Sequence, residues 1–269
     1  MFIHVPKAAG TTFIRLLESY YPERVRYKIP SKESYDKAIR GMNQKKVKDL
    51  KLLQGHMRYD AKCLLAQDFQ AITFLRDPYS RAQSFYKYIL SHNYHPQHEA
   101  LTRQSLSFEE YLRSGLYEPN SQCLHLAGDH GAIEADESVF KRALRRIKDG
   151  DIFAGTVEQF DDCLFLMYRC FQWPFLPLYT RENRSKAEFH LEHTEDSLRC
   201  VADLDHYDLR LHREASKRVS AMIDEMSKRE KWQLFSYRRL NTRYRHSSLF
   251  RDAIHRCRYS RFSPIRITT

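Results

Sequence analysis

The alternation of short apolar runs with longer amphipathic segments is the feature that most constrains how this chain folds. Four runs have the length and composition of buried strands, at residues 2–5, 50–53, 71–75 and 152–155. The segments between and after them predict helices at residues 11–21, 79–92, 108–114, 138–148, 158–171 and 206–227. Strands separated by helices favour an α/β, three-layer fold in which a short central parallel sheet is flanked by helices.

Capping patterns mark several of the expected helix starts. Asp77-Pro78 offers a side-chain cap followed by proline at the first helical position. The patterns SFEE (107–110) and TVEQ (156–159) each fit a capping box, in which two side chains satisfy backbone N–H groups reciprocally. Residues 93–135 are polar and irregular by comparison, and we expect them to form an insertion over the edge of the sheet.

The basic charge of the chain is concentrated in its last part. The net charge is +11, and residues 228–269 contain twelve Lys or Arg against Glu230 and Asp252, so +10 lies there and +1 in residues 1–227. We therefore expect one domain over residues 1–227, with residues 228–269 as a basic helical C-terminal extension of the same domain. The extension has two interpretations: a contact for an acidic polymer or membrane surface, or a helical cover with solvated arginines.

Length, hydropathy and cysteine pattern set further bounds. With 269 residues the chain can bury a substantial core. No apolar stretch reaches the ~18 residues that span a bilayer, and no signal-peptide pattern is present. The six cysteines form no Cys-x-x-Cys pair, which favours free thiols. We expect a cytoplasmic protein if the chain is full length, with a trimmed lumenal domain of the Golgi type as the alternative.

The turn between the first strand and the first helix, HVPKAAGTT, has the composition of an anion site. The residues expected to surround the anion are Lys7, Ala8, Ala9, Gly10, Thr11 and Thr12. A helix start leaves backbone N–H groups without partners, small residues let a phosphate approach them, and a lysine adds a full charge. The lysine precedes the glycine, unlike the lysine of the nucleotide-triphosphate loop, so we expect a different phosphate ester. An ordinary turn with a solvated lysine is the alternative.

The next two strands also end in side chains suited to an anionic ligand. His56 follows the second strand in LLQGHMRYD, and Arg76 follows the third strand in TFLRDPYSRAQSFYKY, with Ser84 two turns into the next helix. In open α/β sheets, ligands bind beyond the carboxyl ends of the parallel strands. We therefore expect Lys7, His56 and Arg76 to line one crevice.

These motifs resemble those of sulfotransferases that use 3′-phosphoadenosine 5′-phosphosulfate (PAPS). FIHVPKAAGTTF resembles their 5′-phosphosulfate loop, and RDPYSRAQSFYKY resembles their 3′-phosphate motif, with Arg76 and Ser84 at the family's eight-residue spacing. QGHMRYD is similar to the Gly-His segment of the carbohydrate branch that includes heparan sulfate 2-O-sulfotransferase. NSQCLHLAG (120–128) and FAGTVEQFDDCLFLMYRCFQWP (153–174) follow the order of that branch. The resemblance covers roughly residues 2–190.

The resemblance implies a P-loop-like fold and the transfer of a sulfuryl group from PAPS to a hydroxyl, on a carbohydrate by analogy with that branch, without a metal. Lys7, with the N–H groups of residues 8–12, would stabilise the charge that develops on the bridging oxygen. Arg76 would bind the 3′-phosphate through its planar guanidinium, and Ser84 would add a hydroxyl. His56 would accept the proton of the acceptor hydroxyl.

A later segment, TRENRSK, resembles the family's loop that closes over the nucleotide. It makes Asn183, Ser185 and Lys186 further candidates for donor binding, with a solvated turn as the alternative.

Two positions depart from the family's pattern. Ala9-Gly10 stands where Gly-Gly is usual, although it still allows close approach of the backbone. Gln54 stands where the heparan enzyme has the first histidine of His-Gly-His, so His56 alone remains as the base. This departure weakens the case for the same polysaccharide as acceptor, but not the case for sulfuryl transfer.

Other readings of the same residues stay open at this point. A kinase with an unusual phosphate loop would need a magnesium-binding carboxylate at the end of the strand 71–75, where Arg76 precedes Asp77. A non-catalytic protein would bind an anionic polymer through the basic extension. Glu158 is the rival for the catalytic base. The histidines of HNYHPQH (92–98) lie in a polar loop that contains proline, which is a weak pattern for zinc.

Overall fold

The computed structural model describes residues 1–29, 35–41, 48–65, 68–128, 132–180 and 194–261, with no side chains described at 35, 36, 64 and 255–261. Its centre is a parallel sheet with the strand order β2-β3-β1-β4-β5. The strands are β1 (Phe2–Ile3), β2 (Arg26–Lys28), β3 (Leu52–Gly55), β4 (Ala71–Leu75) and β5 (Ile152–Thr156). The α/β fold with a parallel sheet flanked by helices is therefore confirmed.

The sheet differs from the expected one in three places, the first being that β1 ends at Ile3 instead of residue 5. The strand β2 has no counterpart in the prediction because its three residues, Arg26–Lys28, lie at the sheet edge and are only partly buried. The strand β3 begins and ends two residues later than predicted. It includes Gln54 and Gly55, which pair with Phe2 and Ile3 of β1, so a polar residue occupies a fully buried strand position.

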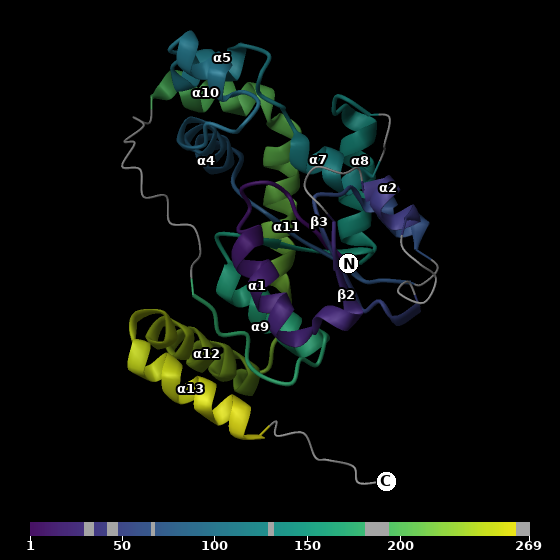
Figure 1. Cartoon of the computed structure of the whole chain (residues 1–269), viewed down its shortest axis with the longest axis vertical. Helices are drawn as coiled ribbons and strands as arrows, with labels where there is room; N and C mark the ends of the chain where they lie inside the picture. Colours follow the sequence, from purple (N-terminus) through teal and green to yellow (C-terminus); the bar gives the residue numbers. More distant parts are fainter. Residues whose placement is uncertain (30–34, 42–47, 66–67, 129–131, 181–193, 262–269) are drawn as a thin grey trace.

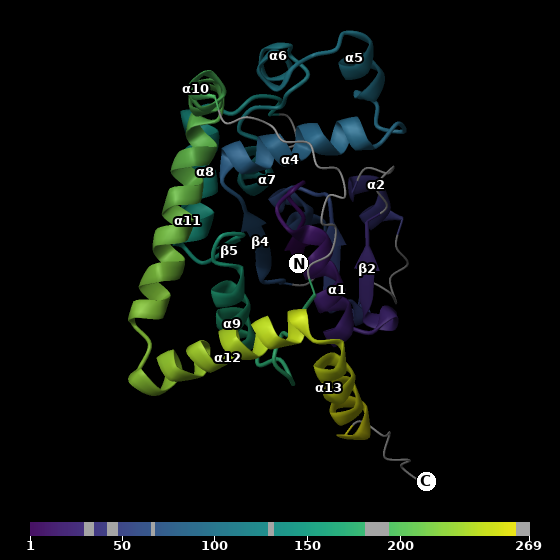
Figure 2. The same cartoon turned by 90° about the vertical axis from the view of Figure 1, so that its left-hand side faces the viewer.

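The helices that follow β1, β4 and β5 place the strand ends next to helix starts. They are α1 (Gly10–Tyr20), α4 (Pro78–Ser91) and α9 (Phe160–Cys170). The rings of Phe13 on α1 and Phe160 on α9 both pack against Phe74 of β4, which joins the two helices on one face of the sheet. The helix α4 crosses over the carboxyl ends of the strands (Figure 2). Both α8 (Glu137–Lys148) and α11 (His206–Asp224) contact β5.

The region 93–135 is more regular than the sequence predicted. It contains α5 (His98–Arg103), α6 (Phe108–Arg113) and α7 (Ser121–Ala127). Side chains from α4, α5, α6 and α10 (Glu195–Leu204) form a second hydrophobic cluster, separate from the main core. The helices α4, α5 and α10 lie together at the top of Figure 1. Of α5, α6 and α7, only α6 was predicted, at residues 108–114. The helices α5 and α7 have six and seven residues, which is too short for a clear helical period, and they are stabilised by packing on other helices, such as α4 for α5 and α8 for α7.

The C-terminal extension is helical, as predicted, and consists of α12 (Lys228–His246) and α13 (Ser248–Arg261). The helix α12 packs on α9, and four of its residues are between 0 % and 5 % exposed: Leu234, Tyr237, Asn241 and Tyr244. The Tyr237 hydroxyl donates to the carbonyl of Pro177 at 2.9 Å. The extension therefore covers part of the core.

The remaining described elements are short. They are α2 (Tyr35–Arg40) and the 3-10 helices Glu23–Val25 and Tyr59–Leu64. The five cysteines whose side chains are described are all free. Among the described residues, no helix combines the length and the apolar character that a membrane crossing requires.

Two of the three capping predictions are confirmed and one is wrong. The Asp77 side chain accepts from the Ser80 N–H with Pro78 at the first helical position, and residues 107–110 form the complete capping box. The pattern at 156–159 is different because Thr156 is the last residue of β5. Its hydroxyl donates to the side chain of Gln159, and α9 begins only at Phe160. Glu158 thus lies in the turn after β5, not in a cap.

Candidate functional site

A cleft of about 820 Å³ opens beyond the carboxyl ends of β1, β3 and β4. In the sheet, β1 lies between β3 and β4. The chain runs from β1 to β2 and β3 on one side and then crosses to β4 and β5 on the other, so a crevice forms beside β1, where the strand order reverses. Lys7, His56, Arg76 and Ser84 all line this cleft. Of the other residues expected at the site, Asn183, Ser185 and Lys186 lie outside the described residues.

The loop after β1 brings its backbone into the cleft through two left-handed residues. Lys7 has φ 66° and Ala9 has φ 57°, and Ala9 is the residue from which α1 begins. Ala9, Gly10, Thr11 and Thr12 line the cleft, whereas the side chain of Ala8 is buried. The first N–H groups of any helix have no acceptor within it, so this geometry directs the positive end of α1 at the cleft.

Glycine at position 10 is required by a neighbouring ring. A Cβ at Gly10 would lie 1.9 Å from the imidazole of His4, which is far inside van der Waals contact. The ring of His4 therefore packs directly against the backbone at the start of α1.

Lys7 and Arg76 place two cations close together. The Arg76 guanidinium donates to the carbonyl of Lys7 at 3.1 Å, and the Lys7 ammonium lies 4.2 Å from the centre of the Tyr88 ring. Burial, and then the charge of Arg76, lower the pKa of Lys7 to about 8. An anion placed between these two groups would oppose both effects.

Arg76 is held in place by a residue that the sequence did not single out. The Arg76 N–H donates to the side-chain oxygen of Gln122 at 3.0 Å, and the side-chain nitrogen of Gln122 donates to the Arg76 carbonyl at 2.9 Å. Gln122 itself is fully buried on α7, and its N–H donates to Asp208 at 3.0 Å. Gln122 belongs to the segment NSQCLHLAG, one of those that resemble the carbohydrate branch. This segment thus holds the backbone at the end of β4 in place.

Gln122 is anchored by a buried polar cluster where α4, α7 and α11 meet. Arg81 lies 3.8 Å from Asp205 and 4.0 Å from Asp208, and all three side chains are nearly or fully buried. The Tyr117 hydroxyl donates to Asp205, which also accepts from the Asn120 N–H at 2.6 Å. This cluster fixes the start of α7 relative to α4 and therefore the position of Arg76.

His56 is oriented by a backbone carbonyl. Its Nδ1 lies 2.9 Å from the carbonyl oxygen of His4. A carbonyl only accepts, so Nδ1 carries the hydrogen and Nε2 is the unprotonated nitrogen of the neutral ring. Burial lowers the pKa of His56, and the charge of Lys28 acts in the same direction, outweighing the hydrogen bond to His4.

Two further histidines surround His56, and sequence analysis missed both. The ring of His4 stacks on that of His56 with centroids 4.2 Å apart, and burial lowers the pKa of His4 to about 3. Burial likewise lowers the pKa of His125, on α7, to about 4, so both rings are neutral near pH 7. Only the fold brings these positions together, so no local pattern signals them.

Gln54 and Glu158 have their own partners. Gln54 is fully buried and its side-chain nitrogen donates to Glu18 of α1 at 3.1 Å. The Glu158 carboxylate accepts from the Asp77 N–H at 3.0 Å and contacts Nε2 of His212 at 2.8 Å. Burial raises the pKa of Glu158, but these hydrogen bonds outweigh it and the pKa lies below its ordinary value. Neither residue lines the cleft.

One wall of the cleft is aromatic. Tyr88 on α4 and His92 just after that helix have ring centroids 4.1 Å apart, and His92 is 5.3 Å from Tyr94. The side-chain nitrogens Nδ1 of His92 and His98 lie 2.8 and 2.9 Å from the carbonyl oxygens of Tyr88 and Ile89. Within the part of the chain that the structure describes, no group of three or more His, Cys, Asp or Glu side chains is arranged to hold a metal.

Comparison with known protein families identifies one over nearly the whole chain. A family model described as "Sulfotransferase family" matches residues 1–261. A search of curated proteins finds no match. The matched span contains every residue of the cleft described above.

Proposed function

Because the chain belongs to the sulfotransferase family and therefore transfers sulfuryl groups, we propose that its donor is PAPS and its acceptor a carbohydrate hydroxyl. The observation that carries this proposal is the meeting of Lys7, Arg76 and the start of α1 in one cleft. PAPS presents a phosphosulfate at one end and a 3′-phosphate at the other, so it needs two separate sets of cationic or N–H donors. Residues that follow β1 and β4 would supply them.

Lys7 is the group that would act on the reacting end of the donor. As the S–O bond breaks, negative charge grows on the bridging oxygen, and an ammonium in a partly dry site stabilises that charge strongly. Lys7 rests on the Tyr88 ring, and a short change of its flexible side chain moves the ammonium to an anion at the start of α1. The N–H groups of residues 10–12 would hold the remaining oxygens.

Arg76 and Ser84 would hold the 3′-phosphate. Both line the cleft, and the backbone of Arg76 is fixed by Gln122, which leaves the guanidinium to form the paired bonds that phosphate favours. Asp77, the carboxylate that a kinase would need for magnesium, instead accepts from Ser80 and caps α4. This observation favours sulfuryl transfer over the kinase alternative.

His56 would take the proton of the acceptor hydroxyl through Nε2. The hydrogen bond from Nδ1 to the His4 carbonyl fixes the tautomer in which Nε2 is an acceptor. A lowered pKa keeps the ring neutral, and hence able to accept a proton, over the whole range near neutral pH. With Glu158 occupied by the Asp77 N–H and His212, His56 is the base that the geometry supports best.

The aromatic wall of the cleft supports a ring-shaped acceptor. The rings of Tyr88, His92 and Tyr94 line the same cleft as His56. Sugar rings combine an apolar face of C–H groups with hydroxyls at the rim, and such a face packs on aromatic rings. A carbohydrate therefore fits this wall while presenting a hydroxyl to Nε2.

The proposal is tested by incubating the protein with PAPS and a panel of sugars, polysaccharides, phenols and sterols. Mass spectrometry should detect addition of one SO₃ group to a carbohydrate, with release of 3′-phosphoadenosine 5′-phosphate (PAP). Transfer only to phenols or sterols would refute the acceptor class but keep the donor. If PAP were released from PAPS with none of the acceptors and the protein did not bind PAP, PAPS would be refuted as the donor.

Donor binding is tested separately by calorimetry with PAP. Replacing Arg76 by Ala should remove charged hydrogen bonds worth ~1.5–3 kcal/mol and weaken PAP affinity by roughly ten- to a hundredfold. The matched control is Arg103→Ala, which removes an exposed arginine paired with Glu99 on α5 and should leave affinity unchanged. Equal affinity of wild type and Arg76→Ala would show that the 3′-phosphate binds elsewhere.

A further inference from the structure

The helices α12 and α13 expose large apolar side chains, two of them on the outer face of α12. Trp232 is 68 % exposed, Phe235 is 52 % exposed and Leu249 is 80 % exposed. Among the described residues, these are three of the six large hydrophobic side chains with high exposure, and the others lie singly on distant elements. Exposed apolar groups that gather on one surface indicate a binding face.

The same face is strongly basic. Trp232, Phe235, Arg239 and Arg243 follow one another at spacings of three or four residues, which places them on one side of α12. The opposite side of α12 carries Leu234, Tyr237 and Tyr244 and is buried in the protein. Further exposed cations of the outer face are Lys228, Arg229 and Lys231.

Few carboxylates balance this charge. Residues 228–254 contain only Glu230 and Asp252 as acids. Glu230 is occupied by Arg169 and by the capping box at Ser227. On other sides of α12, Arg238 and Arg245 pair with Asp162 and Asp161 of α9. On the outer face, arginines lie over aromatic rings: the Arg239 guanidinium is 5.6 Å from the centre of the Phe235 ring, and that of Arg243 is 4.8 Å from the centre of the Phe250 ring.

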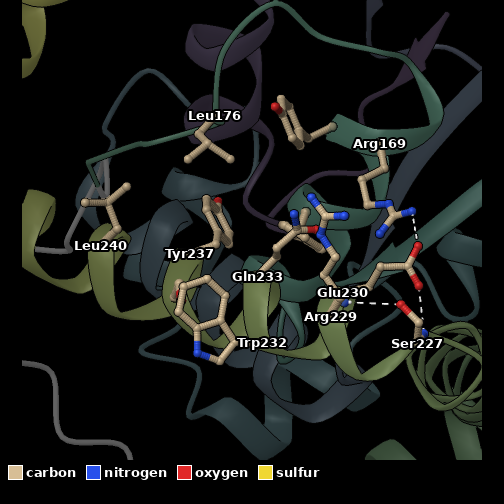
Figure 3. A pocket seen from close by; sticks show the side chains of 12 residues that line it. Arg169, Leu176, Ser227, Arg229, Glu230, Trp232, Gln233, Tyr237 and Leu240 are labelled. Atoms are coloured by element: carbon tan, nitrogen blue, oxygen red, sulfur yellow. Dashed lines mark hydrogen bonds and ion pairs between the residues drawn. The ribbon is translucent and has the colours of Figure 1, made fainter.

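A groove of about 660 Å³ opens beside Trp232, between α12 and the end of α9 (Figure 3). Its two ends differ in chemistry. One end is formed by Leu176, Trp232, Tyr237 and Leu240, and the other by Arg229 and the Arg169–Glu230 pair. An apolar end joined to a cationic end is complementary to an amphiphile with an anionic head.

We propose that this face, called here the α12 face and defined by Trp232, Phe235, Arg229, Arg239 and Arg243, binds the surface of a membrane that contains anionic lipids. Trp and Phe side chains lie at the level of the lipid headgroups in such contacts, and Lys and Arg side chains pair with the anionic heads. An acidic polymer would pair with the arginines equally well but would leave Trp232, Phe235 and the apolar end of the groove uncovered. The contact is peripheral, at the surface of the bilayer.

Trp232 provides its own probe. The chain has two tryptophans, and the other, Trp173, is only 5 % exposed, so a change of emission on vesicle binding reports Trp232. We expect phosphatidylcholine vesicles with phosphatidylserine to co-sediment with the protein and to shift its emission to shorter wavelength, and vesicles of phosphatidylcholine alone to do neither. Lipids brominated on the acyl chain should quench that emission.

Variants of the α12 face separate the contribution of its basic side chains to membrane binding from that of its aromatic side chains. Arg239→Gln and Arg243→Gln should each weaken vesicle binding by about fivefold at low salt, as expected for one basic side chain near an anionic surface. The double variant Trp232→Ser/Phe235→Ser should abolish the binding. The control Leu198→Ser, an exposed leucine on α10, should bind vesicles as the wild type does. All variants replace exposed side chains, and thermal denaturation checks that they fold.

The outcomes that overturn the proposal are equally defined. Equal binding to neutral and anionic vesicles, or no binding to either, refutes an anionic membrane as partner. Binding to heparin that persists in Trp232→Ser/Phe235→Ser, without quenching by brominated lipid, assigns the face to an acidic polymer instead. Affinity for PAP measured on the same variants stays at the wild-type value in every case, because the α12 face contributes no residue to the cleft.

Discussion

At the scale of single residues, the loop after β1 carries a conformational cost at Ala9. Its φ of 57° lies in the left-handed region, which costs a residue with a Cβ roughly 1–2 kcal/mol. Glycine has no such cost there, although it loses more backbone entropy on folding. We expect Ala9→Gly to leave stability unchanged or to raise it by up to about 1 kcal/mol. Thermal denaturation measures this, and Ala8→Gly, at a position without positive φ, is the control that should be destabilised.

Lys7 gives donor binding a dependence on pH. Its pKa in the free protein is about 8, and the donor binds the protonated form. The phosphate monoesters of PAP have a second pKa of about 6, so the affinity for PAP should be nearly constant only between about pH 7 and 8. Above about pH 8 the Kd should rise by up to about tenfold for each pH unit, because a proton must be taken up on binding. Calorimetry over this range measures the effect.

Two variants at position 7 check the cause. Lys7→Arg keeps its charge at every accessible pH and should remove the dependence, whereas Lys7→Ala should lower kcat more than affinity because the charge it stabilises grows in the transition state. A pH dependence that persists in Lys7→Arg would assign it to another group. An unchanged kcat in Lys7→Ala would show that Lys7 only binds.

His56 is expected to set the acidic limit of turnover. The base must be neutral, and its pKa is lowered from 6.5, so kcat should stay constant through neutral pH and fall only below about 6.5. His56→Ala should lower kcat by about two to four orders of magnitude while PAP affinity stays nearly unchanged. The exposed His206→Ala on α11 is the control. If Glu158→Gln lost turnover and His56→Ala kept it, the base would be Glu158.

At the scale of elements, Gln122 of α7 determines where Arg76 lies. Gln122→Ala removes both hydrogen bonds to the Arg76 backbone, which should cost ~1–3 kcal/mol of stability and weaken PAP binding although Gln122 is not in the cleft. Denaturant unfolding and calorimetry on the same variant measure the two effects. Gln159→Ala, which removes the side-chain hydrogen bonds from Thr156 of β5 and Ser216 of α11, should affect stability without affecting PAP binding.

The elements also show what the sequence could predict. Continuous apolar runs such as 71–75 identify buried strands, and cap patterns such as SFEE locate helix starts, because both signals are local. The strand β2 and the short helices α5 and α7 were missed because they are only three to seven residues long and are stabilised by packing on other elements, not by local propensity. At the site, Lys7, Arg76 and His56 follow strands and were therefore found. His4, His125 and Gln122 act only through neighbours that the fold brings to them.

At the scale of the whole molecule, the basic extension is expected to be part of the folded unit. Removing residues 228–269 takes away Leu234, Tyr237 and Tyr244, which are 2–5 % exposed, and each contributes roughly 1.5–3 kcal/mol. That loss is comparable with the total stability of a domain, about 5–15 kcal/mol. We therefore expect the fragment 1–227 to be insoluble or unfolded, and a chain ending at residue 247 to fold with a lowered Tm. A soluble 1–227 fragment that binds PAP would show that residues 1–227 fold without the extension.

The helix α4 has a consequence for how acceptors can change in evolution. Ser84, Phe85, Tyr88 and His92 follow along its cleft side and just beyond its end, so one rigid rod joins the position proposed for the 3′-phosphate to the aromatic wall. With a rise of ~1.5 Å per residue, Tyr88 lies about 6 Å along the axis from Ser84, and no side-chain change alters that spacing. We therefore expect a relative that accepts a larger acceptor to differ in the loop beyond His92, where insertions are tolerated. The helix α4 would keep the same distance between the donor and acceptor positions.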